Sequence, residues 1–259
     1  MTPFSTLLSR TTSTERGLSL DVPPDWAQGR TVFGGLQVSL AVKAMRADVP
    51  DVPLRTLQVT FIGPLTPGTV RVETTILRTG SSATHVEARV FGSELASIVV
   101  GVFGKPRTSA VAVTLTRPTL TPDKAFKLPY IPGLAPAFLQ HFEGTWLRGS
   151  ILLSGGRDTS HTLEVGVLEA GPATESHVIA LADYIPPLAM TFLRKPTNGG
   201  TLSWMLELLT DQFGETVRGW QVDAELMAAR DGYTSQSLVL WSPDGRPIAL
   251  GRQSMVVFA

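Results

Sequence analysis

No cysteine occurs among the 259 residues, and charged residues are scarce. Without cysteine the chain has no disulfide framework, no thiolate nucleophile and no thiolate metal site. Charged residues make up only 17% of the sequence, and 22 Lys and Arg balance 22 Asp and Glu. Because nucleic-acid binding depends on a surplus of positive charge, this balance gives no indication of a nucleic-acid partner.

Long apolar runs are also absent, although 43% of the residues are apolar. No segment has the roughly 18 to 20 consecutive apolar residues that span a bilayer. Residues 1–17 lack the uninterrupted apolar stretch of a signal peptide. We therefore expect a cytoplasmic protein with no membrane partner, and a chain long enough to bury a sizeable core.

Several common catalytic motifs are missing from the sequence. There is no G-x-S-x-G element of a serine hydrolase, no G-x-G-x-x-G dinucleotide motif and no P-loop. The histidines lack the spacing of metal ligands and are better explained as structural or solvated residues: His85, His141, His161 and His177. We expect no metal and no cofactor.

An internal repeat is present. Residues 29–104 and 176–258 each contain an apolar helical segment, a polar break and four extended runs in the same order. The intervening segment contains prolines that keep it extended and outside a sheet interior: Pro106, Pro118, Pro122, Pro129, Pro132 and Pro136. We predict an N-terminal unit at 1–104, a connection at 105–137 and a C-terminal unit at 138–259.

Periodicity predicts the elements of each unit. Residues 201–209 indicate a strand with one apolar face, formed by Leu202, Trp204, Leu206 and Leu208. Residues 35–46 are apolar around nearly the whole helical circumference, which is typical of a buried helix. The Ser-Pro-Asp-Gly sequence at 242–245 predicts a hairpin turn. The fold class is therefore α+β, with an antiparallel sheet covering a buried helix in each unit. Four tryptophans in strand-like runs are expected in the core or an interface: Trp146, Trp204, Trp220 and Trp241.

Three motifs together carry a family resemblance. They are V-F-G-G at 32–35, F-x-x-P at 61–64 and L-R-x-G-x-S at 77–82. This order resembles the hotdog fold. Two such units in one chain resemble the double-hotdog acyl-CoA thioesterases of the bacterial type II family, over a span from residue 29 to the C-terminus.

The resemblance implies a function and a site. The family hydrolyses an acyl-CoA to a free carboxylic acid and CoA, with a water held by an Asp, a Thr and a Gln, and it serves fatty acid metabolism. The matching positions here are Asp183, Thr201 and Gln253. We expect Phe33, Gly34 and Gly35 to bind the substrate, and we expect a homodimer or a higher homo-oligomer. The acyl group itself stays open.

The chemistry of these residue types is consistent with thioester hydrolysis, but each also has a purely structural interpretation. Asp183 lies in the apolar run ALADYI, where desolvation would raise its pKa toward that of a useful base; it could instead end a helix. Thr201 could simply open a strand, and Gln253 could be an edge residue. Backbone N–H groups near Gly34 and Gly35 could stabilise the oxyanion, or the glycines could serve only close packing.

Two alternative functions follow from departures in the sequence. After its Thr the family usually has Asp-His, whereas Leu-Ser-Trp follows Thr201, and Ser-Met follows Gln253 where the family has Glu-Gly. These changes are consistent with a catalytically silent acyl-CoA or lipid-binding protein. The other alternative is a hotdog hydratase or dehydratase, which pairs an Asp with a His a few residues later. No His closely follows Asp183, and this absence counts against a hydratase or dehydratase.

Overall fold

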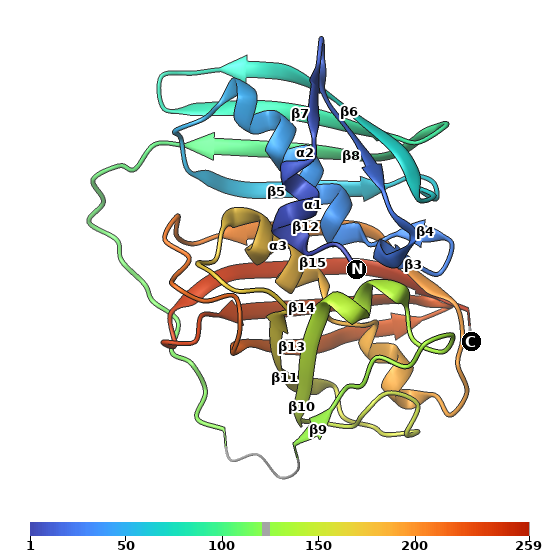
Figure 1. Cartoon of the computed structure of the whole chain (residues 1–259). Helices are drawn as coiled ribbons and strands as arrows, with labels where there is room; N and C mark the ends of the chain where they lie inside the picture. Colours follow the sequence, from blue (N-terminus) through green and yellow to red (C-terminus); the bar gives the residue numbers. More distant parts are fainter. Residues whose placement is uncertain (121–124, 259) are drawn as a thin grey trace.

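The computed structural model describes residues 1–120 and 125–258. In this part of the chain thirteen strands form one antiparallel sheet, in the order β1-β2-β6-β7-β8-β5-β12-β15-β14-β13-β11-β10-β9. Figure 1 shows this sheet as two halves stacked one above the other, with the helices between and in front of them. The two halves meet where β5 pairs with β12. The predicted α+β class is confirmed.

The elements have the following bounds. One half of the sheet contains β1 (Thr12–Thr14), β2 (Gly17–Val22), β5 (Leu54–Phe61), β6 (Gly68–Thr79), β7 (Ala83–Phe91) and β8 (Leu95–Gly104). The other contains β9 (Phe126–Lys127), β10 (Phe142–Arg148), β11 (Ser160–Val167), β12 (Gly199–Leu208), β13 (Trp220–Arg230), β14 (Tyr233–Trp241) and β15 (Pro247–Val257). A separate ribbon contains β3 (Ala27–Gln28) and β4 (Thr31–Val32). The helices are α1 (Phe4–Ser9), α2 (Gly34–Asp48) and α3 (Glu175–Asp183), with short 3₁₀ turns η1 (Pro24–Trp26), η2 (Ala137–His141) and η3 (Leu188–Phe192).

Helix α2 matches the predicted buried helix. Ten of its fifteen residues are buried, from Gly35 through Met45 with Lys43 as the exposed exception. A helix apolar on nearly all sides must be covered on nearly all sides, and here the sheet and α3 do so.

Helices α2 and α3 pack against each other in an antiparallel orientation. A methyl group at Gly35 would lie 3.1 Å from Cα of Ala180, so the helices approach closely near the start of α2. At the other end, the Arg46 guanidinium forms a bidentate ion pair with Glu175, at 3.0 and 2.5 Å. This arrangement places the N-terminus of α2 beside the C-terminus of α3.

The predicted strand at 201–209 is confirmed as β12, with one exception. Trp204, Leu206 and Leu208 are buried, but Leu202 is 38% exposed. The register between β12 and β15 shifts between Thr201 and Ser203. A bulge of this kind turns one residue out of the alternating pattern, so the prediction that Leu202 shares the apolar face is wrong.

The predicted hairpin turn and the predicted buried tryptophans are present in the structure. The turn at 242–245 connects β14 to β15, with Gly245 N–H donating to the Ser242 carbonyl at 2.9 Å. All four tryptophans predicted in the core or an interface are at most 2% exposed: Trp146, Trp204, Trp220 and Trp241. After β8, residues 105–120 of the proline-rich segment run down one side of the molecule (Figure 1). Pro122 lies outside the described residues, and the unit boundaries at 104/105 and 137/138 stay predictions.

Candidate active site

Asp183 is the last residue of α3, and it faces the first half of the molecule. The helix begins with a capping box, in which Thr174 and His177 satisfy each other's backbone N–H groups. Prolines at 186 and 187 end it, since proline cannot continue a helix. The Asp183 carboxylate accepts hydrogen bonds from the Gln253 side chain and from the backbone N–H of Gly35. The carboxylate therefore joins α3 to β15 and α2, rather than capping its own helix.

Gln253 is an interior residue and not an edge residue. It lies on β15, between β12 and β14, and is 1% exposed. Its Nε2 donates to Asp183 Oδ1 at 2.7 Å. An amide nitrogen has two hydrogens, and Asp183 is the only partner of Nε2 among the described residues. The second N–H is thus available to a water or a substrate.

The environment of Asp183 changes its acidity. Burial raises the pKa of Asp183 from 3.8 to about 7, and the hydrogen bonds from Gly35 and Gln253 oppose part of that increase. The charged form loses solvation in the protein interior, and two donors recover only some of it. A carboxyl group with a pKa near 7 can take up and release a proton at neutral pH.

The start of α2 provides the other wall. A methyl group at Gly34 would lie 2.8 Å from Asp183 Oδ2 and 3.1 Å from the Phe61 ring, so a larger residue there would require these side chains to shift. Of the first N–H groups of the helix, that of Gly35 donates to Asp183, and those of Leu36 and Gln37 donate to the carbonyl of residue 33. In the described structure the N–H of Gly34 has no such acceptor.

This arrangement separates the roles of the two glycines. The N–H of Gly35 interacts with the Asp183 carboxylate and opposes part of the rise in its pKa, and the role of Gly35 as an oxyanion donor stays a prediction. Gly35 also serves close packing, as its Cα lies against α3. Gly34 remains as the free donor. Phe33 is fully buried and stacks on Phe138, with 4.2 Å between ring centroids and an angle of 5° between ring planes.

Thr201 lies on the same face of the sheet as Gln253. It pairs with Met255, which is the next inward-facing residue of β15 after Gln253. Thr201 and Gln253 are therefore diagonal neighbours, a position within reach of a shared water. No hydrogen bond joins the Thr201 hydroxyl to Asp183 or Gln253 in the described structure.

Two buried polar atoms beside these residues have no protein partner among the described residues: Trp204 Nε1 and Thr234 Oγ1. Trp204 pairs directly with Gln253, and Thr234 pairs with Met255. A buried donor without a partner costs about 1 to 3 kcal/mol, so such groups usually bind ordered water or a ligand. The sheet face around Gln253 therefore has unused hydrogen-bonding capacity.

Gln236 contacts the site directly, although no motif in the sequence predicted it. It is 1% exposed and pairs with Gln253 across β14 and β15. Its Nε2 donates to Gln253 Oε1 at 2.9 Å. The available signal was its position in YTSQSLVLW, in phase with Thr234, Leu238 and Leu240, all of which are buried.

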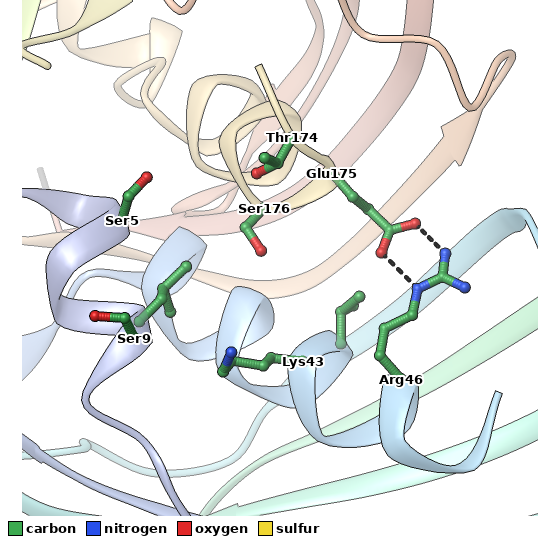
Figure 2. Close-up of a pocket in the computed structure, with 9 residues that line it drawn as sticks. Ser5, Ser9, Lys43, Arg46, Thr174, Glu175 and Ser176 are labelled. Atoms are coloured by element: carbon green, nitrogen blue, oxygen red, sulfur yellow. Dashed lines mark hydrogen bonds and ion pairs between the residues drawn. The ribbon is translucent and has the colours of Figure 1, made fainter. Parts of the chain in front are cut away.

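The opposite end of the helix pair contains a cavity of about 350 Å³. Figure 2 shows it between α1, the end of α2 and the start of α3. Lys43 and the Arg46–Glu175 ion pair line it, together with Ser5, Ser9 and Ser176. It lies away from Asp183, and its only carboxylate is bound by Arg46.

Among the described residues no group of three or more His, Asp or Glu side chains could hold a metal ion. No described helix is long and apolar enough to cross a membrane.

Comparison with solved structures identifies the fold. A conserved protein of unknown function with a hotdog fold from Alicyclobacillus acidocaldarius is 21% identical and covers 99% of this chain and 98% of its own, with a TM-score of 0.86. The tesB protein of Mycobacterium avium subspecies paratuberculosis is 12% identical over 99% and 98% of the two chains, at 0.78. The acyl-CoA thioesterase II TesB2 of Mycobacterium marinum is 12% identical over 97% and 96%, at 0.71. These matches confirm the predicted double hotdog fold.

Comparison with protein families identifies the family. The model of the acyl-CoA thioesterase N-terminal domain matches residues 22–118, and that of the acyl-CoA thioesterase C-terminal domain matches residues 117–257. A search of curated proteins gave no match. The two models together span almost all of the sequence, and the chain belongs to the acyl-CoA thioesterase family.

Proposed function

We propose that the chain hydrolyses an acyl-CoA to a free carboxylic acid and CoA, with Asp183 as the general base. The observation that supports this proposal best is the contact between the two halves. A partly buried carboxylate at the end of α3 lies against the N-terminus of α2, and Gln253 holds one of its oxygens. Hydrolysis needs a base, a positioned water and an oxyanion donor in one place, and this contact would bring a base beside groups able to hold the water and the oxyanion.

In the proposed reaction, a water bound at Asp183 Oδ2 attacks the thioester carbonyl carbon. Its proton passes to the carboxylate as the new C–O bond forms. The C–S bond then breaks, and the CoA thiolate takes the proton from Asp183. A thiol has a pKa near 8.5, so a carboxylic acid with a pKa of about 7 can protonate the leaving thiolate.

The other groups position the water and the oxyanion. The free N–H of Gly34 points from a helix N-terminus, where the peptide dipoles favour negative charge. The absence of a side chain there lets Asp183 Oδ2 and the Phe61 ring lie close to this part of the backbone. The second N–H of Gln253 and the hydroxyl of Thr201 would hold the water from the sheet side.

The apolar residues near the site suggest where the acyl chain lies. Phe33, Phe138, Phe142 and Tyr184 form an aromatic cluster beside the start of α2, with neighbouring ring centroids 4.2 to 5.9 Å apart. An acyl tail gains free energy by leaving water for such surroundings. The rings are buried, so substrate entry requires them to move aside.

We also propose that the chain forms a homodimer, which a molar mass from light scattering would test.

A hydratase or dehydratase mechanism is less well supported than hydrolysis. Such enzymes need a histidine close to the carboxylate. The histidine of α3, His177, lies at the far end of the helix, where its ring contacts Thr174, Glu169 and Ser5. It is therefore engaged away from Asp183.

Release of CoA thiol tests the proposal. The wild type, Asp183→Asn and a control, Asp211→Asn, would be assayed with acyl-CoAs from acetyl to palmitoyl and with benzoyl and phenylacetyl thioesters. The chain has no cysteine, so a thiol reagent detects only CoA. We expect turnover of at least one thioester, a loss of about a hundredfold or more in Asp183→Asn, and no loss in Asp211→Asn, which replaces an exposed aspartate. Saturable binding of acyl-CoA without thiol release would refute hydrolysis and indicate a binding protein.

A further inference from the structure

Gln253 can act in two opposite ways, depending on how its amide is turned. With its NH₂ group toward Asp183, it donates to the carboxylate and favours the charged form. With its carbonyl oxygen toward Asp183, it repels the carboxylate and favours the protonated form. The two orientations have the same shape, so packing alone does not select between them.

The neighbouring residue Gln236 has no such freedom. Its Oε1 accepts a hydrogen bond from the backbone N–H of Leu188 at 2.9 Å, and a backbone N–H can only donate. Its Nε2 lies 3.5 Å from the Pro186 carbonyl, which can only accept. Both backbone groups belong to the turn that follows α3. They fix the Gln236 amide with its nitrogen toward Gln253.

The orientation of the Gln236 amide determines the orientation of the Gln253 amide. The NH₂ group of Gln236 donates to Gln253 Oε1 at 2.9 Å. Turning Gln253 around would place two NH₂ groups against each other in a buried site, where each side chain is only 1% exposed. Leaving buried donors unpaired is costly. The remaining NH₂ group of Gln253 must therefore face Asp183 Oδ1, as it does at 2.7 Å.

We infer that Gln236 is a positioning residue, which orients the Gln253 amide so that Gln253 donates to Asp183 and keeps that carboxylate available as a base. The chain of hydrogen bonds runs from the Leu188 N–H through both glutamines to the carboxylate. The inference rests on the proposed function, because it concerns the same base, but its effect on the acidity of Asp183 can be measured without a substrate.

Two substitutions of Gln236 separate positioning from packing. Gln236→Met keeps the approximate volume and removes the donor, so Gln253 can turn its oxygen to Asp183. We expect the ascending limb of the kcat/KM profile to move up by about one pH unit and kcat to fall about tenfold. Gln236→Glu keeps a donor only while it is protonated. We expect near wild-type activity at low pH, and a descending limb at higher pH that the wild type lacks, because a carboxylate there would accept from Gln253 and reverse its amide.

Gln221→Met serves as the matched control. Gln221 on β13 is also buried, and its amide donates to Asp223, a residue outside the site. We expect its pH profile to be that of the wild type. A folded Gln236→Met with wild-type kcat and pH profile, or a Gln236→Glu without the descending limb, would overturn the inference. Circular dichroism would establish folding for each variant.

A different result would identify failure of the proposed function. If the wild type released no thiol from any acyl-CoA, hydrolysis would be refuted, and the orientation would be tested by the pKa of Asp183 alone. That pKa follows from the pH dependence of stability with and without Asp183→Asn. A higher value in the Gln236→Met background would support the inference, and an unchanged value would refute it.

Discussion

Replacing Asp183 with Asn tests the environment of this partly buried carboxylate through protein stability, with no assumption about a substrate. Burial raises the pKa of Asp183 from 3.8 to about 7. The folded state therefore holds this proton more tightly than the unfolded chain does. The resulting stabilisation is complete below pH 3.8 and is lost as the pH rises through 7. Asn does not ionise, so the variant lacks this pH dependence.

The magnitude follows from the pKa. At pH 5, two units below 7, the bound proton contributes about 2.7 kcal/mol, at 1.36 kcal/mol per unit, and at pH 9 it contributes almost nothing. Relative to the wild type, Asp183→Asn should therefore become more stable by about 2.7 kcal/mol between pH 5 and pH 9. Burial lowers the pKa values of His141 and His161, but both proteins contain these residues, so their effects cancel in the difference.

Urea unfolding of both proteins at pH 5, 6, 7, 8 and 9 provides the measurement. The difference between their free energies of unfolding should change by about 1.36 kcal/mol per pH unit below pH 7 and should level off above pH 7. The loss of hydrogen bonds on substitution adds only a constant to this difference. A difference that does not vary with pH would show that Asp183 has an ordinary pKa in the folded state, and would refute the argument that burial prepares it as a base.

Other substitutions test the remaining parts of the site and the helix pair. Gly34→Ala places a methyl group 2.8 Å from the proposed base, so we expect kcat/KM to fall about tenfold or more. The control Gly200→Ala adds a methyl group with nothing within 4 Å and should leave kcat/KM unchanged. Equal effects of the two substitutions would contradict this steric role of Gly34. Thr201→Val removes a hydroxyl with no bond to the neighbouring site residues, so the melting temperature should stay constant while kcat falls about tenfold; an unchanged kcat would remove Thr201 from the mechanism. Arg46→Met breaks a bidentate, largely buried ion pair and should lower the free energy of unfolding, measured with urea, by about 1 to 3 kcal/mol. Arg71→Met breaks a more exposed pair and should lower it by less than about 1 kcal/mol. Similar losses of stability would contradict the importance of burial.

Periodicity predicted the elements that depend on a local pattern. The helix at 35–46 and the strand at 201–209 were both identifiable, because burial on all sides or on one face leaves a trace in the sequence. Leu202 was misassigned, because a bulge depends on the register of the neighbouring strand. The pairing of β5 with β12 also has no local signal, since any two strand edges can form the same backbone hydrogen bonds.

The site was predictable only in part, for a similar reason. Asp183 and Gln253 came from a family resemblance, and the structure brings them within 2.7 Å. Gln236 was missed because a single polar residue in a strand gives no sign of its partners. The use of the Gly35 N–H by Asp183 could not be foreseen either, because it depends on how closely α2 and α3 cross.

The duplicated units create two equivalent ends of the helix pair, and comparison of these ends explains why the proposed chemistry is confined to one. At the first end, α3 approaches Gly35 of α2 most closely at Ala180. Asp183 lies three positions after Ala180 in the sequence. At the second end, Ser39 makes the corresponding contact, with Ser176, and three positions later the chain has Val42. Val42 is therefore the counterpart of the proposed base, Asp183, and it is apolar.

The strands show the same difference between the two ends. The bulge of β12 against β15 has its counterpart in β5 against β8, and counting from each bulge aligns Gln253 with Gly101. A side chain at Gly101 would meet Met45 Sδ at 2.8 Å, so Met45 already occupies the space that the glutamine fills in the other unit. Val42 and Met45 thus occupy the positions at one end that correspond to the carboxylate and the amide at the other end. If the proposed function is correct, this asymmetry predicts a single reaction site per chain, to which the first unit contributes the start of α2.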